Sequence, residues 1–275
     1  MRTGIVIQAR LNSKRLSGKV LLPITEEITV IEEILDIASS VKNCDKVILA
    51  TTDKQTDDRL VEFVTSRTNF EVYRGSEDNV LKRFCDVAEK FDFDNIVRLT
   101  GDNPCIDASI VEKALNEHLL KGSSYTHTVG YPIGMNVEVI SRAALLESLD
   151  HAEAMDKEHV TFYARNHKEK FAHNIMRANF PKEVANLRLT LDSKEDYLML
   201  RILFDYLKSN EEHFSFQDIF DLWQRKPYIF TLNQEVYQKR VFKNLSEELN
   251  EAAEILDLQE MFNAADILKS YQHER

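Results

Sequence analysis

Hydrophobic residues in the first 120 positions follow two alternating patterns. Short apolar runs are typical of buried strands, whereas apolar residues that recur every three or four positions are typical of helices. Four strand-like runs, each followed by a helical pattern, occupy residues 4–9 and 31–41, 47–52 and 60–64, 70–73 and 80–91, and 96–100 and 110–119. Strands that alternate with helices in this way predict a parallel sheet covered by helices on both faces.

The pattern changes after residue 122. Strand-like runs at 124–129 and 135–140 flank a turn-rich stretch, helical patterns lie near 143–149 and 159–165, and further strands are predicted at 171–177 and 187–191. From Ser193 onward the chain is mostly helical, and apolar residues between 245 and 268 face acidic ones, which predicts an amphipathic tail helix or helix pair. The predicted fold class is α/β: a three-layer, Rossmann-like, mostly parallel sheet with a β-rich insertion and a helical C-terminal tail.

Composition and charge limit the partners of the chain. Of 275 residues, 43% are hydrophobic and 29% are charged, which is typical of a soluble globular protein. The net charge of −11 repels polyanions, so we expect neither nucleic acid nor an anionic membrane as a partner. Three widely spaced cysteines and the lack of a signal-like apolar segment indicate a cytoplasmic protein without disulfides or structural zinc.

The loop after the first predicted strand is rich in cations. Ligands of open parallel sheets bind beyond the carboxyl ends of the strands, and residues 8–19 carry Arg10, Lys14, Arg15 and Lys19 there. With Gly18 allowing close backbone approach, this loop predicts a phosphate site; the alternative is a solvated basic loop. The sequence has neither a P-loop nor a GxGxxG dinucleotide motif, which weakens ATPase and dehydrogenase interpretations.

Two carboxylates follow other predicted strands. Asp102 comes after residues 96–100, and Asp192 ends the run 187–191. Mg²⁺ usually takes one or two protein carboxylates together with phosphates and water, so the pair predicts a magnesium site. The alternative is helix capping: Asp107 is a better placed N-cap than Asp102, whereas for Asp192 both interpretations stay open.

The remaining candidate residues are less specific. Arg74 and Asp78 are positioned to bind a base or ribose, but Ser76 and Asp78 are equally suited to capping the helix that follows, and both interpretations stay open. Glu138 lies in a predicted strand, and His159 follows Glu158 at a helix start; a histidine near an apolar face is more often structural than catalytic.

Several of these motifs together resemble the cytidylyltransferase family. They are Gln8-Ala9-Arg10, Ser13, Arg15-Leu16, Gly18-Lys19-Val20-Leu21, residues 74–81, Arg98-Leu99-Thr100-Gly101-Asp102-Asn103-Pro104, Gly134 with Glu138, Glu158-His159-Val160-Thr161, and residues 188–192 with Glu195-Asp196. They occur in family order over residues 3–240, and they are specific together rather than singly. The nearest branch is the spore-coat polysaccharide biosynthesis type, which is similar to the acylneuraminate and deoxy-octulosonate cytidylyltransferases.

The resemblance implies a nucleotide-diphospho-sugar transferase fold and a Mg²⁺-dependent reaction. CTP and an acidic sugar, such as a nonulosonic acid, would give a CMP-sugar and pyrophosphate for surface polysaccharide or glycan synthesis. It also implies a homodimer, a nucleotidyltransferase domain at 1–243 with an insertion at 125–180 for acceptor binding and dimerisation, and a helical tail at 244–275. The site residues so implied are Arg15, Lys19 and Asp102 for catalysis; Gln8, Ala9, Arg10, Ser13, Gly18, Thr52, Arg74, Ser76, Asp78, Thr100 and Gly101 for the nucleotide; Gly134, Asn136, Glu138, Glu158 and His159 for the acceptor; and Asp102 and Asp192 for the metal.

Two positions depart from the family pattern, and three different functions compete with it. Ser17 replaces a usual proline and Cys105 a usual aliphatic residue, but neither change removes a charge. A glycosyltransferase would use a DxD metal motif, and Asp92-Phe93-Asp94 precedes its strand and so belongs to the opposite sheet edge. The second competing function is a cytidylyltransferase acting on a phosphorylated non-sugar acceptor, and the third is a nucleotide-binding scaffold without turnover.

Overall fold

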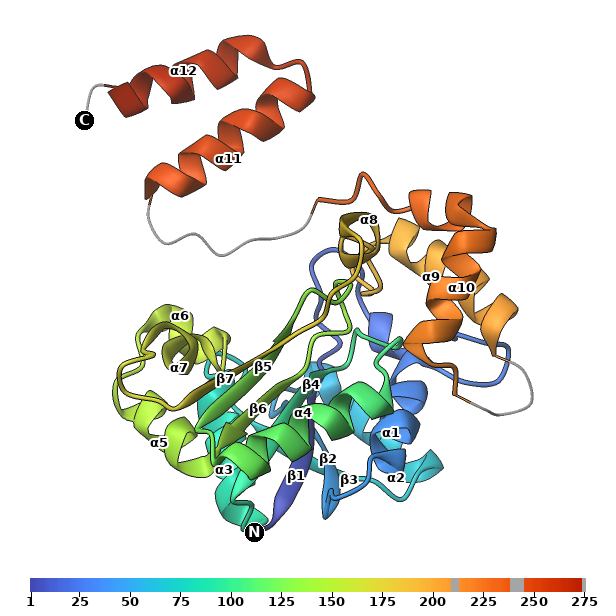
Figure 1. The fold of residues 1–275 in the computed structure, drawn as a ribbon, viewed down its shortest axis with the longest axis vertical. Helices are drawn as coiled ribbons and strands as arrows, with labels where there is room; N and C mark the ends of the chain where they lie inside the picture. The colour runs from blue at the N-terminus through green and yellow to red at the C-terminus, as the bar shows by residue number, and fades with distance from the viewer. Residues whose placement is uncertain (209–212, 238–244, 274–275) are drawn as a thin grey trace. The chain divides into compact units, whose positions relative to one another are not determined.

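The computed structural model describes residues 1–208, 213–237 and 245–273 (Figure 1). The chain forms two compact units, Met1–Val236 and Tyr237–Arg275. The boundary predicted between residues 243 and 244 lies outside the described residues.

A single seven-stranded sheet organises the first unit. Its strands are β1 (Thr3–Gln8), β2 (Lys46–Thr52), β3 (Glu71–Gly75), β4 (Asn95–Thr100), β5 (Tyr125–Val129), β6 (Glu138–Ser141) and β7 (His173–Arg177), in the spatial order β3-β2-β1-β4-β6-β5-β7. Only β6 runs antiparallel to its neighbours. Gln8 pairs in register with Ala50 of β2 and Thr100 of β4, so these three strands reach the same sheet edge together.

Helices cover both faces of the sheet, which confirms the predicted three-layer α/β fold (Figure 1). One face packs against α1 (Val30–Ser40), α2 (Asp58–Arg67), α4 (Ala108–Lys121), α8 (Lys182–Ala185), α9 (Lys194–Leu207) and α10 (Phe216–Arg225). The other face packs against α3 (Val80–Lys90), α5 (Arg142–Asp150) and α7 (Phe162–Asn166). Neighbouring strand residues such as Ile5 and Val6 are buried on opposite faces, as expected for a sheet covered on both sides.

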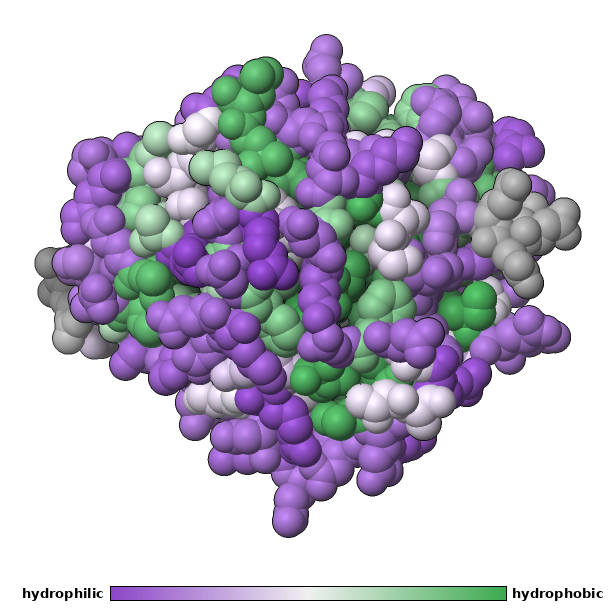
Figure 2. Space-filling view, turned by 90° about the horizontal axis from the view of Figure 1, so that it is seen from below, coloured by the Kyte–Doolittle hydropathy of each residue, from purple (hydrophilic) through white to green (hydrophobic). Residues whose placement is uncertain are grey.

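The predicted β-rich insertion extends the main sheet instead of forming a separate one. Its strands β5, β6 and β7 continue the sheet beyond β4, and α5, α6 (Ala154–Glu158) and α7 lie between β6 and β7 in the chain. Short 3-10 helices occupy Lys19–Leu21, Gln55–Asp57 and Pro227–Thr231. The face drawn in Figure 2 is mainly hydrophilic, with apolar residues in small groups between polar ones.

The prediction of a strand at residues 187–191 is wrong. This segment pairs with Ile133 through a single bridge at Arg188, and the Leu191 amide then donates to the Asp102 carbonyl at 2.8 Å. Its leucines are buried in the hydrophobic core although the segment is not a strand of the sheet. Burial alone therefore accounts for their apolar pattern.

The second unit is a helix pair, α11 (Leu245–Leu258) and α12 (Phe262–His273), which is one of the two predicted forms of the tail. Across the described residues, no helix has the length and apolar character needed to cross a membrane.

Candidate active site

A buried lysine joins two carboxylates at the carboxyl edge of the sheet. The Lys19 ammonium donates to Asp102 Oδ2 at 2.6 Å and to Asp192 Oδ1 at 2.8 Å. Gly18, at a φ of 69°, turns the first loop so that the short helix carrying Lys19 can begin there. Burial lowers the pKa of Lys19, but Asp102 and Asp192 outweigh it and hold this pKa above its ordinary value. The predicted phosphate loop and both predicted metal ligands therefore meet at one point.

Asp192 belongs to this cluster and does not cap a helix. The Arg15 guanidinium lies 2.7 Å from Asp192 Oδ2, and the Arg188 guanidinium lies 3.2 Å from the same oxygen. The N-cap of α9 is Ser193. Burial raises the pKa of Asp192, but the charges of Lys19, Arg15 and Arg188 hold it below its ordinary value. Arg188, which the sequence placed in a motif without a role, also pairs with buried Asp196 at 2.8 Å and so fixes the start of α9.

A second hydrogen-bonded chain holds Asp102. The Thr100 hydroxyl donates to Asp102 Oδ1 at 2.7 Å, and the Asn103 amide donates to that hydroxyl at 2.7 Å. Asp107 caps α4 as expected, by accepting from the Ser109 amide at 2.8 Å. Asp102 is thus free of a capping role and turned toward Lys19.

The first loop is anchored by a residue that sequence reasoning missed. Asp57, almost fully buried, accepts from the Leu11 amide at 2.7 Å and from the Thr52 hydroxyl. The Gly18 amide donates back to the Leu11 carbonyl at 2.9 Å, which closes the loop around Ser13. Asp57 is one of several acidic residues at the start of a helix. From its residue type and position one would therefore predict only helix capping, and not an anchor for the first loop.

Gly101 allows two strand ends to approach each other closely. A Cβ at Gly101 would lie 2.7 Å from the Cβ of Ala9, and the Gly101 amide donates to the Gln8 carbonyl at 2.8 Å. The structure thus gives Gly101 a packing role, so a larger side chain there is expected to affect folding as well as binding.

The three residues predicted to bind the nucleotide at the end of β3 and in the loop after it differ in their contacts in the structure. Arg74 donates to the carbonyls of Thr52 at 3.0 Å and Lys54 at 2.8 Å and pairs with Asp58 at 2.7 Å, so it ties β3 to the connection before α2. Asn79 caps α3, and neither Ser76 nor Asp78 does. Ser76 accepts from the Asn79 amide at 3.1 Å. Asp78 is exposed. Nucleotide binding by Arg74, Ser76 and Asp78 stays a prediction.

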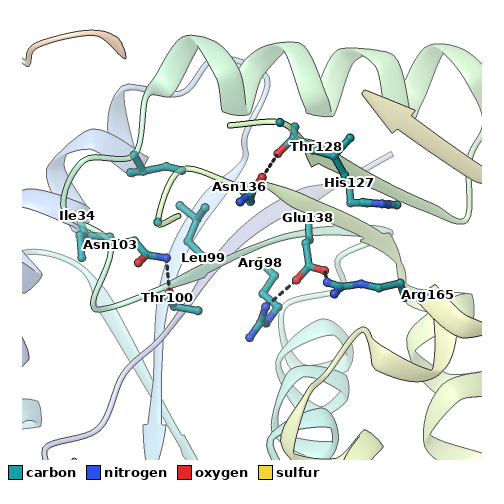
Figure 3. Close-up of a pocket in the computed structure, with 14 residues that line it drawn as sticks. Ile34, Arg98, Leu99, Thr100, Asn103, His127, Thr128, Asn136, Glu138 and Arg165 are labelled. Atoms are coloured by element: carbon teal, nitrogen blue, oxygen red, sulfur yellow. Dashed lines mark hydrogen bonds and ion pairs between the residues drawn. The ribbon is translucent and has the colours of Figure 1, made fainter. Parts of the chain in front are cut away.

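A cavity of about 480 Å³ opens beside the cluster, between the ends of β4, β5 and β6 (Figure 3). Its lining includes the predicted acceptor residues Gly134, Asn136 and Glu138, together with Thr100 and Asn103. Glu158 and His159 do not line it: Glu158 is exposed, and the His159 ring lies 6.3 Å from that of Phe162. Their acceptor role stays a prediction.

Three charged side chains line this cavity, of which Glu138 is buried and Arg165 is half exposed. Glu138 pairs with Arg98 at 2.6 Å and with Arg165, and it accepts from the hydroxyls of Tyr125 and of Thr161, the latter at 2.7 Å. Burial raises the pKa of Glu138, but the two arginines outweigh burial and hold it well below its ordinary value. Figure 3 shows Arg98 and Arg165 approaching Glu138 from opposite sides.

Gln8 connects the first strand to that network, since its side-chain oxygen accepts from Arg98 at 3.1 and 3.2 Å. Arg165 and Tyr125 were not predicted, because they come from distant segments and no local motif marks them. Thr161 lies inside one of the motifs shared with the family, but no role was predicted for it. Arg98 lies inside one of the family motifs, but the only feature of the sequence that pointed to a role for it was a charged residue within an apolar strand.

The predicted magnesium ligands fit the ion in their donor chemistry. Asp102 and Asp192 each already give one oxygen to a shared cation, the Lys19 ammonium. Asn103 Oδ1 is buried and has no hydrogen-bond partner among the described residues, which adds a hard oxygen nearby. The same part of the chain holds no group of three or more His, Cys, Asp or Glu suited to a metal. The other ligands would therefore be phosphate and water.

Comparison with known proteins decides the family. The family model described as cytidylyltransferase matches residues 4–260. The chain belongs to the cytidylyltransferase family. The spore coat polysaccharide biosynthesis protein SpsF of Bacillus subtilis is 36% identical to this cytidylyltransferase over 229 residues, which cover 81% of the chain and 94% of SpsF.

Solved structures agree with this assignment. A cytidylyltransferase from Leptospira borgpetersenii is 31% identical, with a TM-score of 0.77, and the match covers 86% of this chain and 100% of that one. A CMP:2-keto-3-deoxy-manno-octonic acid synthetase solved with CTP is 17% identical, with a TM-score of 0.56 over 74% of this chain and 99% of that one, and so supports the fold alone.

The DxD motif of the competing glycosyltransferase lies away from the cluster. Asp92 and Asp94 precede β4, at the opposite edge of the sheet from Asp102. Arg142 pairs with Asp92 at 2.9 Å, and Asp94 accepts from the Arg2 amide at 2.7 Å. Both carboxylates therefore have structural partners far from the cavity.

Proposed function

We propose that this cytidylyltransferase uses CTP to activate an acidic sugar, giving a CMP-sugar and pyrophosphate. The observation that carries the proposal is the meeting of the cationic first loop, Asp102 and Asp192 beside a cavity with a charged lining. The name of its Bacillus relative supports a product used in polysaccharide synthesis.

In this reaction an acceptor hydroxyl loses its proton to solvent and its oxygen bonds to the α-phosphorus of CTP. The bond from that phosphorus to the oxygen it shares with the β-phosphate breaks, and pyrophosphate leaves. The negative charge that grows on the pyrophosphate needs fixed cations, because positioning and electrostatics carry most of phosphoryl-transfer catalysis. Arg10, Arg15 and Lys19 supply them from one loop, and Asp57 holds that loop in place. When the triphosphate binds, Lys19 exchanges its carboxylate partners for phosphate oxygens.

Asp102 and Asp192 would hold Mg²⁺ with the phosphates. The ion would neutralise phosphate charge and orient the acceptor oxygen. Thr100 and Asn103 keep Asp102 oriented, and Arg188 does the same for Asp192.

The charge balance of the cavity supports an acidic acceptor. Its lining has two cations, Arg98 and Arg165, against one carboxylate, Glu138. Burial, followed by the charge of Arg165, lowers the pKa of His127 to about 4, so this ring is neutral at pH 7. One positive charge is left over, and Arg165, whose side chain is 49% exposed, can offer it to a carboxylate.

Pyrophosphate release tests the proposal. The protein is incubated with each of the four nucleoside triphosphates and Mg²⁺, with 3-deoxyulosonic and nonulosonic acids as acceptors and neutral hexoses as controls. We expect release only with CTP and an acidic sugar, and loss of release with EDTA that excess Mg²⁺ restores. Release with neutral sugars alone, or nucleotide binding without any release, contradicts the proposal.

A matched pair of variants links the activity to the cavity. Arg165→Gln removes the exposed cation, and we expect KM for the acidic sugar to rise about tenfold while KM for CTP stays the same. Arg142→Gln, which removes an arginine at the opposite sheet edge, is the control and leaves both constants unchanged.

A further inference from the structure

Arg83 is a buried arginine on the inner face of α3. It lies on the helix face that also carries the buried residues Val80, Phe84 and Val87. Only 2% of its surface is exposed, although the apolar periodicity of the helix predicts a hydrophobic residue there. A cation on the core face of a helix is costly unless something else binds it.

The described residues offer Arg83 few partners. Its Nη1 donates to the Ser76 carbonyl at 3.0 Å, and its Nε is buried without a hydrogen-bond partner. Within the described part of the chain, no carboxylate lies within ion-pair distance of the guanidinium. A planar group with five donors is therefore mostly unused.

Arg83 lies where three ligand-facing loops converge. Burial, followed by the like charge of Arg10, lowers its pKa to about 10, while Asp57, Asp53 and Glu77 act against this shift. These residues follow β1, β2 and β3. Arg10 and Glu77 also pair with each other at 3.4 Å, joining the first and third loops.

The sheet order assigns these loops to the nucleoside. In the proposed function, Lys19 and Asp102 hold the triphosphate at the ends of β1 and β4, and the cavity for the acceptor opens on the β4 and β6 side. This leaves the ends of β2 and β3 for the rest of the nucleotide. Arg83 lies there, because its Nη1 donates to the Ser76 carbonyl and a Cβ on Gly75, the last residue of β3, would lie 3.2 Å from its Cγ.

We propose that the Arg83 guanidinium reads the base of the bound nucleotide, donating to O2 and N3 of cytosine. This inference rests on the proposed use of CTP. Cytosine presents two adjacent acceptors, O2 and N3, which match the parallel donors of a guanidinium. Uracil presents a donor at N3, which would face a donor of Arg83, so the same contact excludes UTP.

The alternative is that Arg83 only supports the third loop through the Ser76 carbonyl. Loss of that support would weaken CTP and UTP alike, because the loop would move for both nucleotides. A change in the ratio between the two nucleotides therefore separates base recognition from loop support.

Three variants carry the test: Arg83→Gln, Arg83→Lys and the control Lys82→Gln. Lys82 neighbours Arg83 on α3, but its side chain is 54% exposed and pairs with Asp86. Two quantities are measured: binding of CMP and UMP by calorimetry, and kcat/KM for CTP and UTP from pyrophosphate release with one acceptor. We expect both Arg83 variants to lose the preference for cytosine by about tenfold or more, and Lys82→Gln to keep it.

Equal losses for both bases, or an unchanged preference, overturn the inference. Arg83→Lys decides the matter if Arg83→Gln does not fold, since lysine keeps the charge but not the planar pair of donors. Calorimetry does not depend on turnover. Wild-type protein that prefers CMP but releases no pyrophosphate therefore contradicts the proposed function and leaves base recognition standing.

Discussion

Replacing Glu138 by glutamine tests the charged lining of the cavity. The Glu138 side chain is 8% exposed and pairs with Arg98, whose side chain is 19% exposed, and with Arg165, which is 49% exposed. Glutamine keeps the shape of the side chain and an oxygen that accepts from Tyr125 and Thr161. It therefore removes the negative charge and replaces the oxygen that accepts from Arg98 by an amide donor.

The expected loss follows from the two arginines separately. Arg165 regains water when its partner is neutral, so its pair contributes no more than about 1 kcal/mol, as for other exposed pairs. Arg98 is left as a largely buried, unpaired cation, and breaking a buried pair costs about 3 kcal/mol or somewhat more. We expect Glu138→Gln to lower the free energy of unfolding by about 3–4 kcal/mol, and the melting temperature by roughly 6–16 °C for a domain of this size.

Urea unfolding and calorimetry measure this loss. Asp92→Asn is the control, because it removes an exposed carboxylate that also pairs with an arginine, Arg142, and should change stability little. A loss below about 1 kcal/mol for Glu138→Gln would refute the reasoning, because Arg98 would then be satisfied without Glu138.

Four further outcomes are expected. Asp57→Ala leaves the partly buried Leu11 amide without its acceptor, and calorimetry should show about tenfold weaker CTP binding. Gly101→Val places a side chain against Ala9 and should destabilise the fold by about 1–3 kcal/mol in urea, not only weaken binding. The folded-state pKa of Glu138 is lowered from 4.5, so the stability that this group contributes is present above pH 4.5 and is lost as the pH falls below it. Urea titrations should therefore show a smaller loss of stability with falling pH in Glu138→Gln than in the wild type. Folding lowers the pKa of His127 from 6.5 to about 4. As the pH falls between these values, the unfolded state binds a proton that the folded state does not, and the free energy of unfolding decreases. His127→Gln should make this decrease smaller.

Much of the fold and part of the site could be predicted because they depend on local pattern and on one topological rule. Apolar runs and helical spacing gave the alternating elements, since burial dictates both. Lys19 and Asp102 come together because parallel strands end at one edge. Asp192 reaches the same edge without a strand, held by Arg15 and Arg188.

The rest could not be predicted because it depends on contacts between distant segments. Arg165 and Thr161 meet Glu138 only after β6 has been placed between β4 and β5. The run at 187–191 shows that buried leucines in loops have the same periodicity as a strand. Asp57 was missed because its partner is a backbone amide of the first loop, which no sequence pattern records.

The most direct test of the proposed site is the turnover of Asp102→Asn. Pyrophosphate release from CTP is measured with an accepted acidic sugar and Mg²⁺, beside Asp94→Asn as a carboxylate at the opposite sheet edge. We expect Asp102→Asn to lose at least about a hundredfold in kcat, as when one charge-stabilising group is removed from an active site, with its melting temperature almost unchanged. Near-normal turnover by Asp102→Asn would contradict the assignment of Lys19, Asp102 and Asp192 as the catalytic centre.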